Sequence, residues 1–196
     1  MTVFLIILIA YLIGSIPFGL LGKFFFKIED PRTFGSKNIG ATNVLRSGNK
    51  KAAAFTLFFD MFKGFIAVFI SSFIDNDLVY LAILSVVFGH IFPIYLLFKG
   101  GKGVATFLGA LVSYSAVVGS LTLLAWITVF YFTRKSSVAG ISAIVLSNLF
   151  LFVFCDNTSV QFSLLLLSIF ILFKHSENIK RLLNKEEFSF QGRDKN

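Results

Sequence analysis

Three polar segments of this 196-residue chain carry residue types that bind phosphate. The first, Gly35–Arg46, reads Gly-Ser-Lys-Asn-Ile-Gly-Ala-Thr-Asn-Val-Leu-Arg. Its glycines let backbone amides turn toward an anion, and its Ser, Thr, Asn and Arg side chains add hydrogen-bond donors. The spacing from Gly35 to Gly40 imitates a Walker A loop, but Ala41 stands where that loop requires lysine. We therefore predict an anion site without nucleotide binding, and the alternative is a solvated loop that caps the next helix. The side chains that could contact phosphate are Ser36, Asn38, Thr42, Asn43 and Arg46.

The second segment, Phe98–Gly103, reads Phe-Lys-Gly-Gly-Lys-Gly and lies directly before an apolar helix. Glycines at the amino terminus of a helix, flanked by lysines, form an anion site from backbone amides, the helix dipole and point charges. A simple cytoplasmic turn would need the lysines but not the three glycines, so we favour the anion site. His90 and Pro93 precede it where an apolar span breaks, and a membrane histidine is costly unless it faces a polar cavity. The candidate residues here are His90, Lys99, Gly100, Gly101, Lys102 and Gly103.

The third segment, His175–Arg181, reads His-Ser-Glu-Asn-Ile-Lys-Arg. On a helix, His175, Asn178 and Arg181 lie on one face, because residues three apart are neighbours. An amphipathic helix whose basic residues contact lipid headgroups is the alternative. The short connection that ends at Ser137 adds further hydrogen-bond donors on the same side of the membrane.

Asp60 and Lys63 lie one helical turn apart within an apolar segment. Opposite charges at this spacing can neutralise each other inside a membrane. We favour that structural role over catalysis, although charges within membranes often line a substrate path.

The composition is that of a membrane protein. Apolar residues make up 56% of the chain and charged residues only 14%, which excludes an ordinary soluble globular protein. The net charge of +8 suits anionic lipid headgroups or phosphorylated substrates better than nucleic acid on so apolar a chain. The single cysteine, Cys155, cannot form an intrachain disulfide, and the Cys and His spacing predicts neither a metal site nor a bound cofactor.

Basic and non-basic connections alternate along the chain. Seventeen of the 18 lysines and arginines fall into four clusters between apolar stretches, and Lys63 is the exception. Short loops rich in Lys and Arg stay on the cytoplasmic side, and a span needs roughly 20 apolar residues. We therefore predict an all-α integral membrane protein, a bundle of about seven transmembrane helices, with its amino terminus outside and its carboxyl terminus inside. The predicted spans are residues 3–22, 52–74, 78–98, 104–117, 119–133, 138–155 and 160–173.

Residues 104–133 are the ambiguous part of this topology. Thirty residues would form a helix of about 45 Å, which is too long for one comfortable crossing. One crossing would also place Arg134, Lys135 and the basic tail outside, whereas two crossings place every basic cluster inside. We expect a split near residues 113–120. We also expect one polytopic domain over residues 1–185, followed by a short cytoplasmic tail over residues 186–196.

Together, the three segments resemble the motifs of the bacterial membrane acyl-phosphate:glycerol-3-phosphate acyltransferases of the PlsY type. The first motif is Gly35–Arg46, and Ser-Ile-Pro-Phe-Gly precedes it at residues 15–19. The second is Gly89–Pro93 followed by Lys99–Thr106, and the third is His175–Leu182. Each motif is weak by itself, but their order and separations are specific, and the resemblance covers nearly the whole chain.

The resemblance implies an enzyme of phospholipid synthesis. Such an enzyme transfers a fatty acyl group from acyl phosphate to the 1-hydroxyl of sn-glycerol 3-phosphate. The products are lysophosphatidic acid and phosphate. The implied partners are both substrates, the lipid bilayer and a soluble enzyme that forms the acyl phosphate, whereas nucleic acid is not expected. The implied location is the bacterial cytoplasmic membrane, with the active site facing the cytoplasm.

The resemblance also implies roles for particular residues. Ser36 and Arg46 match essential residues of the first motif, and His175 and Asn178 match functional residues of the third. The glycines of Gly100–Gly103 match a loop associated with glycerol phosphate binding. The predicted catalytic residues are Ser36, Arg46, His90, Lys102, His175 and Asn178. The predicted substrate-binding residues are Asn38, Thr42, Asn43, Lys99, Gly100, Gly101, Gly103, Thr106 and Ser137.

Glu187 matches a glutamate that is linked to structural integrity in this family. The sequence departs from the family just before it, because Lys185 and Glu186 stand where the family often has Gly-Thr. The role of Glu187 therefore stays open at this point.

The chemistry of an acyl phosphate predicts direct transfer. This mixed anhydride has a good leaving group, so little nucleophilic help is needed. We expect Ser36 to orient phosphate without forming an acyl-enzyme, while the donor's own phosphate or a histidine takes the hydroxyl proton. Arg46, Lys102 and backbone amides would supply electrostatic stabilisation.

A membrane transporter of a phosphorylated small molecule is the alternative function. It would also be polytopic and basic. Transporters tend to bind substrate near the bilayer midplane between repeated halves. Here the polar motifs gather at one face and no repeat is visible, so we favour the acyltransferase.

Overall fold

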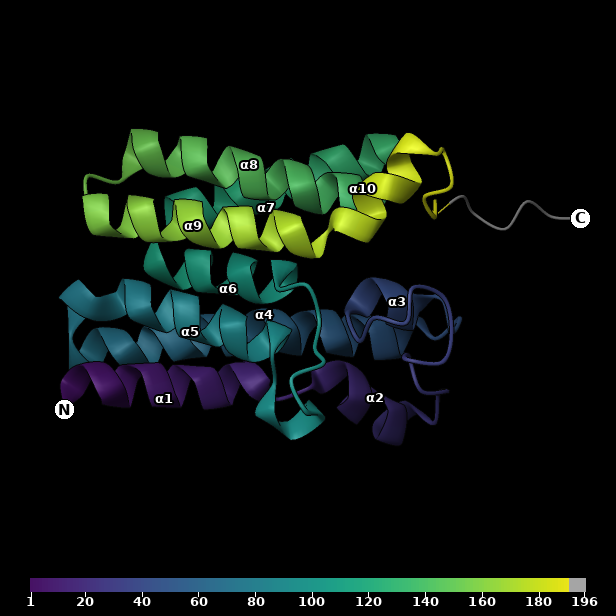
Figure 1. The fold of residues 1–196 in the computed structure, drawn as a ribbon, viewed down its shortest axis with the longest axis horizontal. Coiled ribbons are helices and arrows are strands. Elements are labelled where there is room, and N and C mark those ends of the chain that lie inside the picture. Colours follow the sequence, from purple (N-terminus) through teal and green to yellow (C-terminus); the bar gives the residue numbers. More distant parts are fainter. Residues whose placement is uncertain (191–196) are drawn as a thin grey trace, which may run out of the picture. The chain divides into compact units, whose positions relative to one another are not determined.

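The computed structural model describes residues 1–190, which form helices joined by loops and contain no strand. The expected all-α class is therefore confirmed. Contacts divide the chain into two compact units, Met1–Gly119 and a second that begins at Ser120, and we describe each by itself (Figure 1). Residues 191–196 of the predicted tail lie outside the described residues.

The first apolar segment is broken into two helices. These are α1 (Thr2–Ser15) and α2 (Phe18–Phe26). Pro17 lacks an amide hydrogen and its ring keeps the preceding residue out of the helical region, so Ile16 is extended with φ −63° and ψ 118°. The span predicted at residues 3–22 is therefore not one continuous helix.

The rest of the first unit alternates long helices with short turns. After α2, the first motif contains α3 (Ala41–Leu45) and leads into α4 (Lys50–Ile74). The 3-10 turn η1 (Asn76–Leu78) precedes α5 (Val79–Ile91), and the 3-10 turn η2 (Ile94–Leu96) follows it. The last helix that lies wholly in this unit is α6 (Val104–Tyr114).

Glycines bring the helices of the first unit into close contact. Helix α1 packs on α5, and α4 packs on α6. A Cβ atom on Gly14 or Gly89 would overlap backbone atoms across the α1–α5 contact. A Cβ on Gly64 or Gly109 would do the same across the α4–α6 contact. Helices in lipid associate through such packing of small residues, because lipid tails are as apolar as the side chains.

Four helices form the described part of the second unit. Helix α7 (Ala116–Thr133) begins in the first unit and continues into α8 (Ser136–Phe154), α9 (Thr158–Lys174) and α10 (Ser176–Leu183). Helix α8 packs on α9, and the Asn148 amide donates a hydrogen bond to the Ser168 hydroxyl at 2.9 Å. Helices α9 and α10 meet at a bend of 56°. The segment after α10 returns to the start of α8, where the Phe190 amide donates to the Arg134 carbonyl at 2.8 Å.

Within the described residues, five helical segments are long and apolar enough to cross a membrane, and six if α9 and α10 form one bent span. Helix α6 has 11 residues and is shorter than the roughly 20 that a simple crossing needs. The segment 104–133 does divide into two helices, at Ser115. The number of crossings and the orientation stay predictions.

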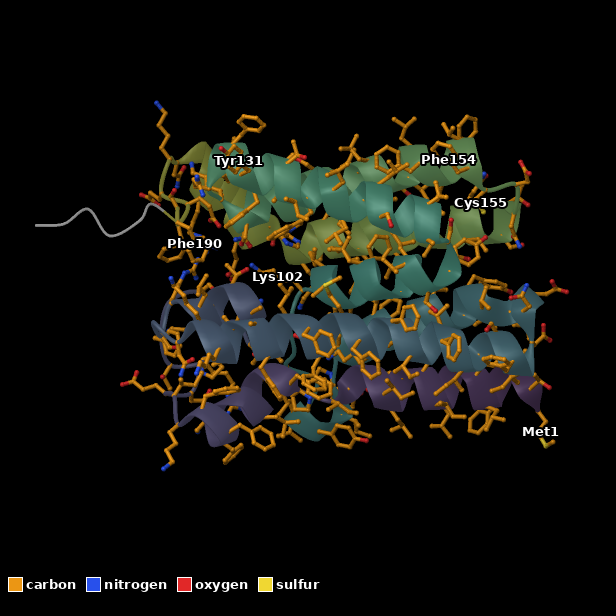
Figure 2. All side chains as sticks on the ribbon, turned by 180° about the vertical axis from the view of Figure 1, so that it is seen from behind. Met1, Lys102, Tyr131, Phe154, Cys155 and Phe190 are labelled. Atoms are coloured by element: carbon orange, nitrogen blue, oxygen red, sulfur yellow. The ribbon has the colours of Figure 1, made fainter. Side chains whose placement is uncertain are left out.

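Each unit carries its predicted motifs toward one end. In the first unit, Lys102 lies toward the end that holds α2 and α3, and Met1 lies at the opposite end (Figure 2). In the second unit, Phe154 and Cys155 lie at one end and Phe190 lies at the other, where α10 is found (Figures 1 and 2).

Candidate active site

Asn43 organises the first motif from inside. Its side chain is only 2% exposed, and its amide nitrogen donates to three backbone carbonyls of the preceding loop. These carbonyls belong to Pro31, Phe34 and Asn38, at 2.6, 3.2 and 2.9 Å. A buried amide group with this many partners holds a loop in one conformation.

The same side chain joins the two first-motif residues that are expected to be essential. The Asn43 Oδ1 atom accepts a hydrogen bond from the Ser36 amide at 2.9 Å and from the Arg46 Nη1 atom at 3.1 Å. Asn43 therefore holds Ser36 and Arg46 in place, and its predicted contact with phosphate stays a prediction. The Asn38 Oδ1 atom accepts a hydrogen bond from the Gly40 amide at 2.9 Å. Phosphate binding by Asn38 and Thr42 stays a prediction.

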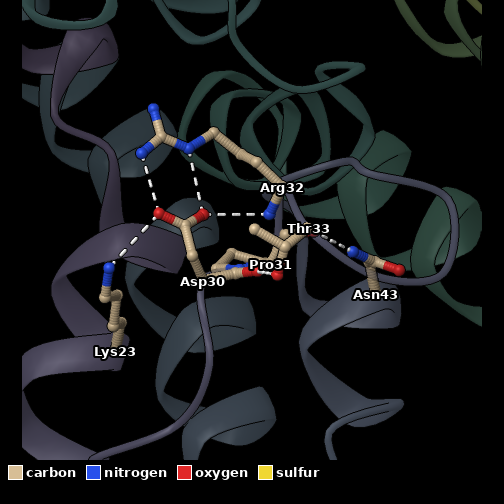
Figure 3. A network of polar contacts seen from close by, with 6 residues as sticks. All are labelled: Lys23, Asp30, Pro31, Arg32, Thr33 and Asn43. Carbon is tan, nitrogen blue, oxygen red and sulfur yellow. Dashed lines mark hydrogen bonds and ion pairs between the residues drawn. The ribbon is translucent and has the colours of Figure 1, made fainter.

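Asp30 anchors the start of this loop to α2. Its carboxylate accepts hydrogen bonds from the Arg32 side chain at 2.7 and 3.0 Å and from Lys23 at 3.3 Å (Figure 3). The hydrogen bonds from Arg32 hold the pKa of Asp30 well below its usual range, against the opposing effect of burial. The adjacent Pro31 carbonyl is one of the acceptors of Asn43, so the two networks are continuous along the chain.

The second motif closes the carboxyl end of α5. The amides of Gly100 and Gly101 donate to the carbonyls of Ile91 and His90 at 3.1 and 3.0 Å. A Cβ on Gly101 would overlap the imidazole of His90. Gly103, which caps the start of α6, has a φ of +92° that favours glycine. The amides of Gly100 and Gly101 therefore satisfy α5 carbonyls in this structure, and substrate binding by the loop stays a prediction.

The other second-motif residues differ in exposure. Lys99 is exposed and Lys102 is half-buried, so both ammonium groups remain candidates for phosphate binding. Thr106 is fully buried where α6 meets α4, with its carbonyl against Gly64. Among the described residues its hydroxyl oxygen has no hydrogen-bond partner, and substrate binding by Thr106 stays a prediction.

His90 belongs to a buried cluster with Asp60 and Lys63. The Lys63 Nζ atom lies 2.8 Å from Asp60 Oδ1, which confirms the expected ion pair. The His90 Nδ1 atom lies 3.5 Å from the same carboxylate oxygen. Lys63 also donates to the Ile16 carbonyl at the break between α1 and α2, at 2.8 Å. Sequence spacing indicated the ion pair but not His90 or Ile16, because these come from other parts of the chain.

His175 of the third motif lies at the bend between α9 and α10. Its side chain is buried, and its Nδ1 atom lies 2.8 Å from the Ile171 carbonyl. A carbonyl only accepts, so Nδ1 carries the hydrogen, and a neutral ring then has its lone pair on Nε2. This tautomer can accept a proton or a hydrogen bond at Nε2.

Glu187 is the residue whose role the sequence left open. It is buried and accepts hydrogen bonds from Asn178 Nδ2 at 2.7 Å and from Arg181 Nε at 2.8 Å. Burial alone would raise the pKa of Glu187, but Asn178, Ser137 and Arg181 stabilise the carboxylate and bring the pKa below its usual value. Of the three residues predicted to share a face, Asn178 and Arg181 both contact Glu187, whereas the His175 ring contacts the Ile171 carbonyl of α9.

The departure from the family before Glu187 also has a structural counterpart. Lys185 adopts a left-handed backbone with φ 61°, a conformation that favours glycine. Glycine, which the resemblance leads us to expect there, is thus the residue that the turn prefers. Among the described residues, no group of three or more His, Cys, Asp or Glu could hold a metal ion.

Comparisons with known proteins identify the family of this chain. The family model described as glycerol-3-phosphate acyltransferase matches residues 4–185. A glycerol-3-phosphate acyltransferase of Bartonella quintana (strain Toulouse) is 43% identical over 97% of this chain and 93% of the relative. One of Nitrosomonas eutropha (strain DSM 101675 / C91 / Nm57) is 40% identical over 95% of this chain and 96% of the relative.

Solved structures give the same result. The crystal structure of PlsY (YgiH), an integral membrane glycerol 3-phosphate acyltransferase, matches with a TM-score of 0.90 and 36% identity. The match covers 97% of this chain and 96% of that one. The transporter alternative raised by the sequence finds no support here. The chain therefore belongs to the glycerol-3-phosphate acyltransferase family, as an integral membrane protein of the PlsY type.

Proposed function

We propose that this protein transfers a fatty acyl group from acyl phosphate to the 1-hydroxyl of sn-glycerol 3-phosphate. The products are lysophosphatidic acid and phosphate. The observation that carries the proposal is the match to PlsY, which is known in a glycerol 3-phosphate form and a lysophosphatidic acid form. These two molecules differ by one acyl group, so they are the acceptor and the product of such a transfer.

The reaction needs no external reagent. The hydroxyl oxygen attacks the acyl carbonyl carbon and forms the ester bond, while the bond from that carbon to the phosphate oxygen breaks. Phosphate leaves with the bonding electron pair. The hydroxyl proton passes to the donor's phosphate or to a histidine.

The described residues suit particular parts of this chemistry. Arg46, held by Asn43, and Lys102 stabilise phosphate charge and the charge that develops on the acyl carbonyl oxygen. The Ser36 amide is bound to Asn43, so its hydroxyl is the group that orients phosphate. His175, with a lone pair on Nε2, can accept a hydrogen bond from the acceptor's hydroxyl.

The setting of the reaction is part of the proposal. Both the acyl donor and the product carry a long apolar chain, which suits a protein embedded in a bilayer. We place the enzyme in the bacterial cytoplasmic membrane with its active site facing the cytoplasm, supplied by a soluble enzyme that forms acyl phosphate. The clustering of basic residues in alternate connections supports this orientation.

A donor comparison tests the proposal. The purified protein is assayed in detergent with glycerol 3-phosphate and either palmitoyl phosphate or palmitoyl-CoA, and the lipid product is identified by mass spectrometry. We expect lysophosphatidic acid only from palmitoyl phosphate, and product from palmitoyl-CoA alone would contradict the proposal. Arg46→Gln should lower activity about tenfold or more, because it removes a charged hydrogen-bond donor. Lys27→Gln, at an exposed lysine, is the matched control and should leave activity unchanged.

A further inference from the structure

The buried cluster of Asp60, Lys63 and His90 points to two residues that the proposed chemistry does not use. All three side chains are 2 to 4% exposed, although charged groups are costly inside a membrane. We infer that Asp60 and Lys63 are positioning residues of the glycerol 3-phosphate site, which set the geometry of the first and second motifs. This inference rests on the proposed function.

His90 connects Asp60 to the second motif. The Nδ1 side of the ring faces Asp60 at 3.5 Å, and the Nε2 side lies where a Cβ of Gly101 would be. The His90 carbonyl also accepts the Gly101 amide at 3.0 Å. The ring and the backbone of one residue therefore fix the position of the glycine loop, and the carboxylate of Asp60 lies beside the ring.

Lys63 connects the same cluster to the first motif. It donates to the Ile16 carbonyl, which also accepts the Phe18 amide at 3.2 Å at the break before α2. Helix α2 starts directly after this break, and Gly19 of α2 lies so close to the Ile39 carbonyl that a Cβ would overlap it. Lys63 thus holds the turn from which α2 packs against the first motif.

A purely structural ion pair would not require this arrangement. Replacing a buried ion pair by apolar residues is often neutral or stabilising, so such a pair is weak evidence for stability. The contact between α4 and α6 is already formed by close approaches at Gly64 and Gly109. The informative feature is which neighbours the two residues contact. Asp60 contacts His90, which leads to the second motif, and Lys63 contacts Ile16, which leads through α2 to the first motif.

A double-mutant cycle tests the link between His90 and the loop. Gly101→Ala in the otherwise unchanged protein should raise the KM for glycerol 3-phosphate about tenfold, because the methyl group displaces the loop from the ring. In a His90→Ala background the space is open, and the same substitution should change this KM by less than about twofold. An equal increase in both backgrounds would show that Gly101 acts independently of His90 and would overturn the link.

The neutral pair Asp60→Asn with Lys63→Met tests the two positioning residues. We expect it to fold with a thermal unfolding midpoint near that of the unchanged protein. Its KM for glycerol 3-phosphate should rise about tenfold, while the KM for palmitoyl phosphate stays within about twofold. Unchanged constants would overturn the inference. If the pair does not fold, Asp60→Asn alone replaces it with the same expectation, since it keeps the shape of the side chain.

Ser71→Ala is the matched control for a buried polar residue of α4. Its hydroxyl bonds only along its own helix in the contacts observed, to the Ala67 carbonyl at 2.8 Å, so both KM values should stay unchanged. Different results would refute the proposed function and the positioning role. If the wild-type protein does not acylate glycerol 3-phosphate, the proposed function is refuted. If the wild-type protein is active and the variants have the same KM values, only the positioning role is refuted.

Discussion

The carboxylate of Glu187 lies 2.7 Å from the amide nitrogen of Asn178 and holds it inside the third motif. The second carboxylate oxygen takes the Arg181 guanidinium at 2.8 Å. One buried acidic group thereby fixes two neighbours on the same face of α10. This contact gives Glu187 a physical role, which is to orient the Asn178 and Arg181 side chains of the third motif.

Glu187→Gln should weaken this arrangement, because a neutral amide has one acceptor oxygen and loses the ion pair with Arg181. We expect kcat/KM to fall about tenfold, the loss that corresponds to a charge-assisted hydrogen bond. Initial rates at saturating and limiting glycerol 3-phosphate measure this effect. Glu186→Gln, at the exposed neighbour, is the control and should leave the rates unchanged.

The stability lost in Glu187→Gln should be larger at neutral pH than in acid. The pKa of Glu187 in the folded protein lies below its ordinary value of 4.5. The ionised group therefore stabilises the fold above about pH 4.5, and this contribution is lost as the pH falls from there toward the folded pKa. Thermal unfolding at pH 7 and in acid should show the gap between the two proteins closing in acid. A gap that widens in acid would contradict the assignment.

Lys185→Gly should stabilise the protein, since Lys185 is held at φ 61°. A side chain in the left-handed region costs about 1–2 kcal/mol, part of which the greater flexibility of an unfolded glycine offsets. We expect a net gain of up to about 1 kcal/mol in unfolding free energy. Lys180→Gly within α10 is the matched control and should destabilise by about 1 kcal/mol. Equal destabilisation by both substitutions would refute the explanation of the turn.

Asn43→Asp separates the two halves of the Asn43 network. The aspartate can still accept from Ser36 and Arg46, but it cannot donate to the three loop carbonyls, and it adds a buried charge. We expect a loss of about 1–3 kcal/mol in unfolding free energy. Asn38→Asp keeps the acceptor for the Gly40 amide, so its stability should change by less than about 0.5 kcal/mol. Similar losses in both variants would contradict the central role of Asn43.

The orientation of the chain can be tested by cysteine accessibility. In a Cys155→Ser background, single cysteines at Asp75, Ser115 and Asn157 should react with an impermeant thiol reagent added outside the cell. Ser115 is the informative position, because it separates α6 from α7 and decides whether the short helix α6 crosses the membrane. Labelling at Ser115 only after permeabilisation would show that this position does not face the outside, and would contradict the predicted two crossings of residues 104–133.

Much of the fold could be predicted from the sequence because it depends on local composition. The apolar runs and the alternation of basic connections predicted helices close to α4, α8 and α9, and the split at Ser115. The break after Ser15 was missed because the apolar run continues through Pro17, and hydropathy alone does not register a missing amide hydrogen.

The site was predictable in its residue types but not in its contacts. Gly-rich, basic motifs indicated where phosphate chemistry would lie. That Asn43 binds its own loop, that Gly100 and Gly101 donate to α5, and that His90 meets Asp60 all depend on tertiary packing. No spacing along one chain encodes which polar groups are consumed by the fold and which are left for substrate.

Direct acyl transfer is the central claim, and a quench experiment tests it most directly. The enzyme is mixed with palmitoyl phosphate labelled in the acyl group, without and then with glycerol 3-phosphate, and protein and lipid are separated after acid quenching. The account predicts an unlabelled protein at every time, and one lysophosphatidic acid formed for each phosphate released, only when the acceptor is present. A stoichiometric label on Ser36 that glycerol 3-phosphate chases into product would contradict it and establish an acyl-enzyme.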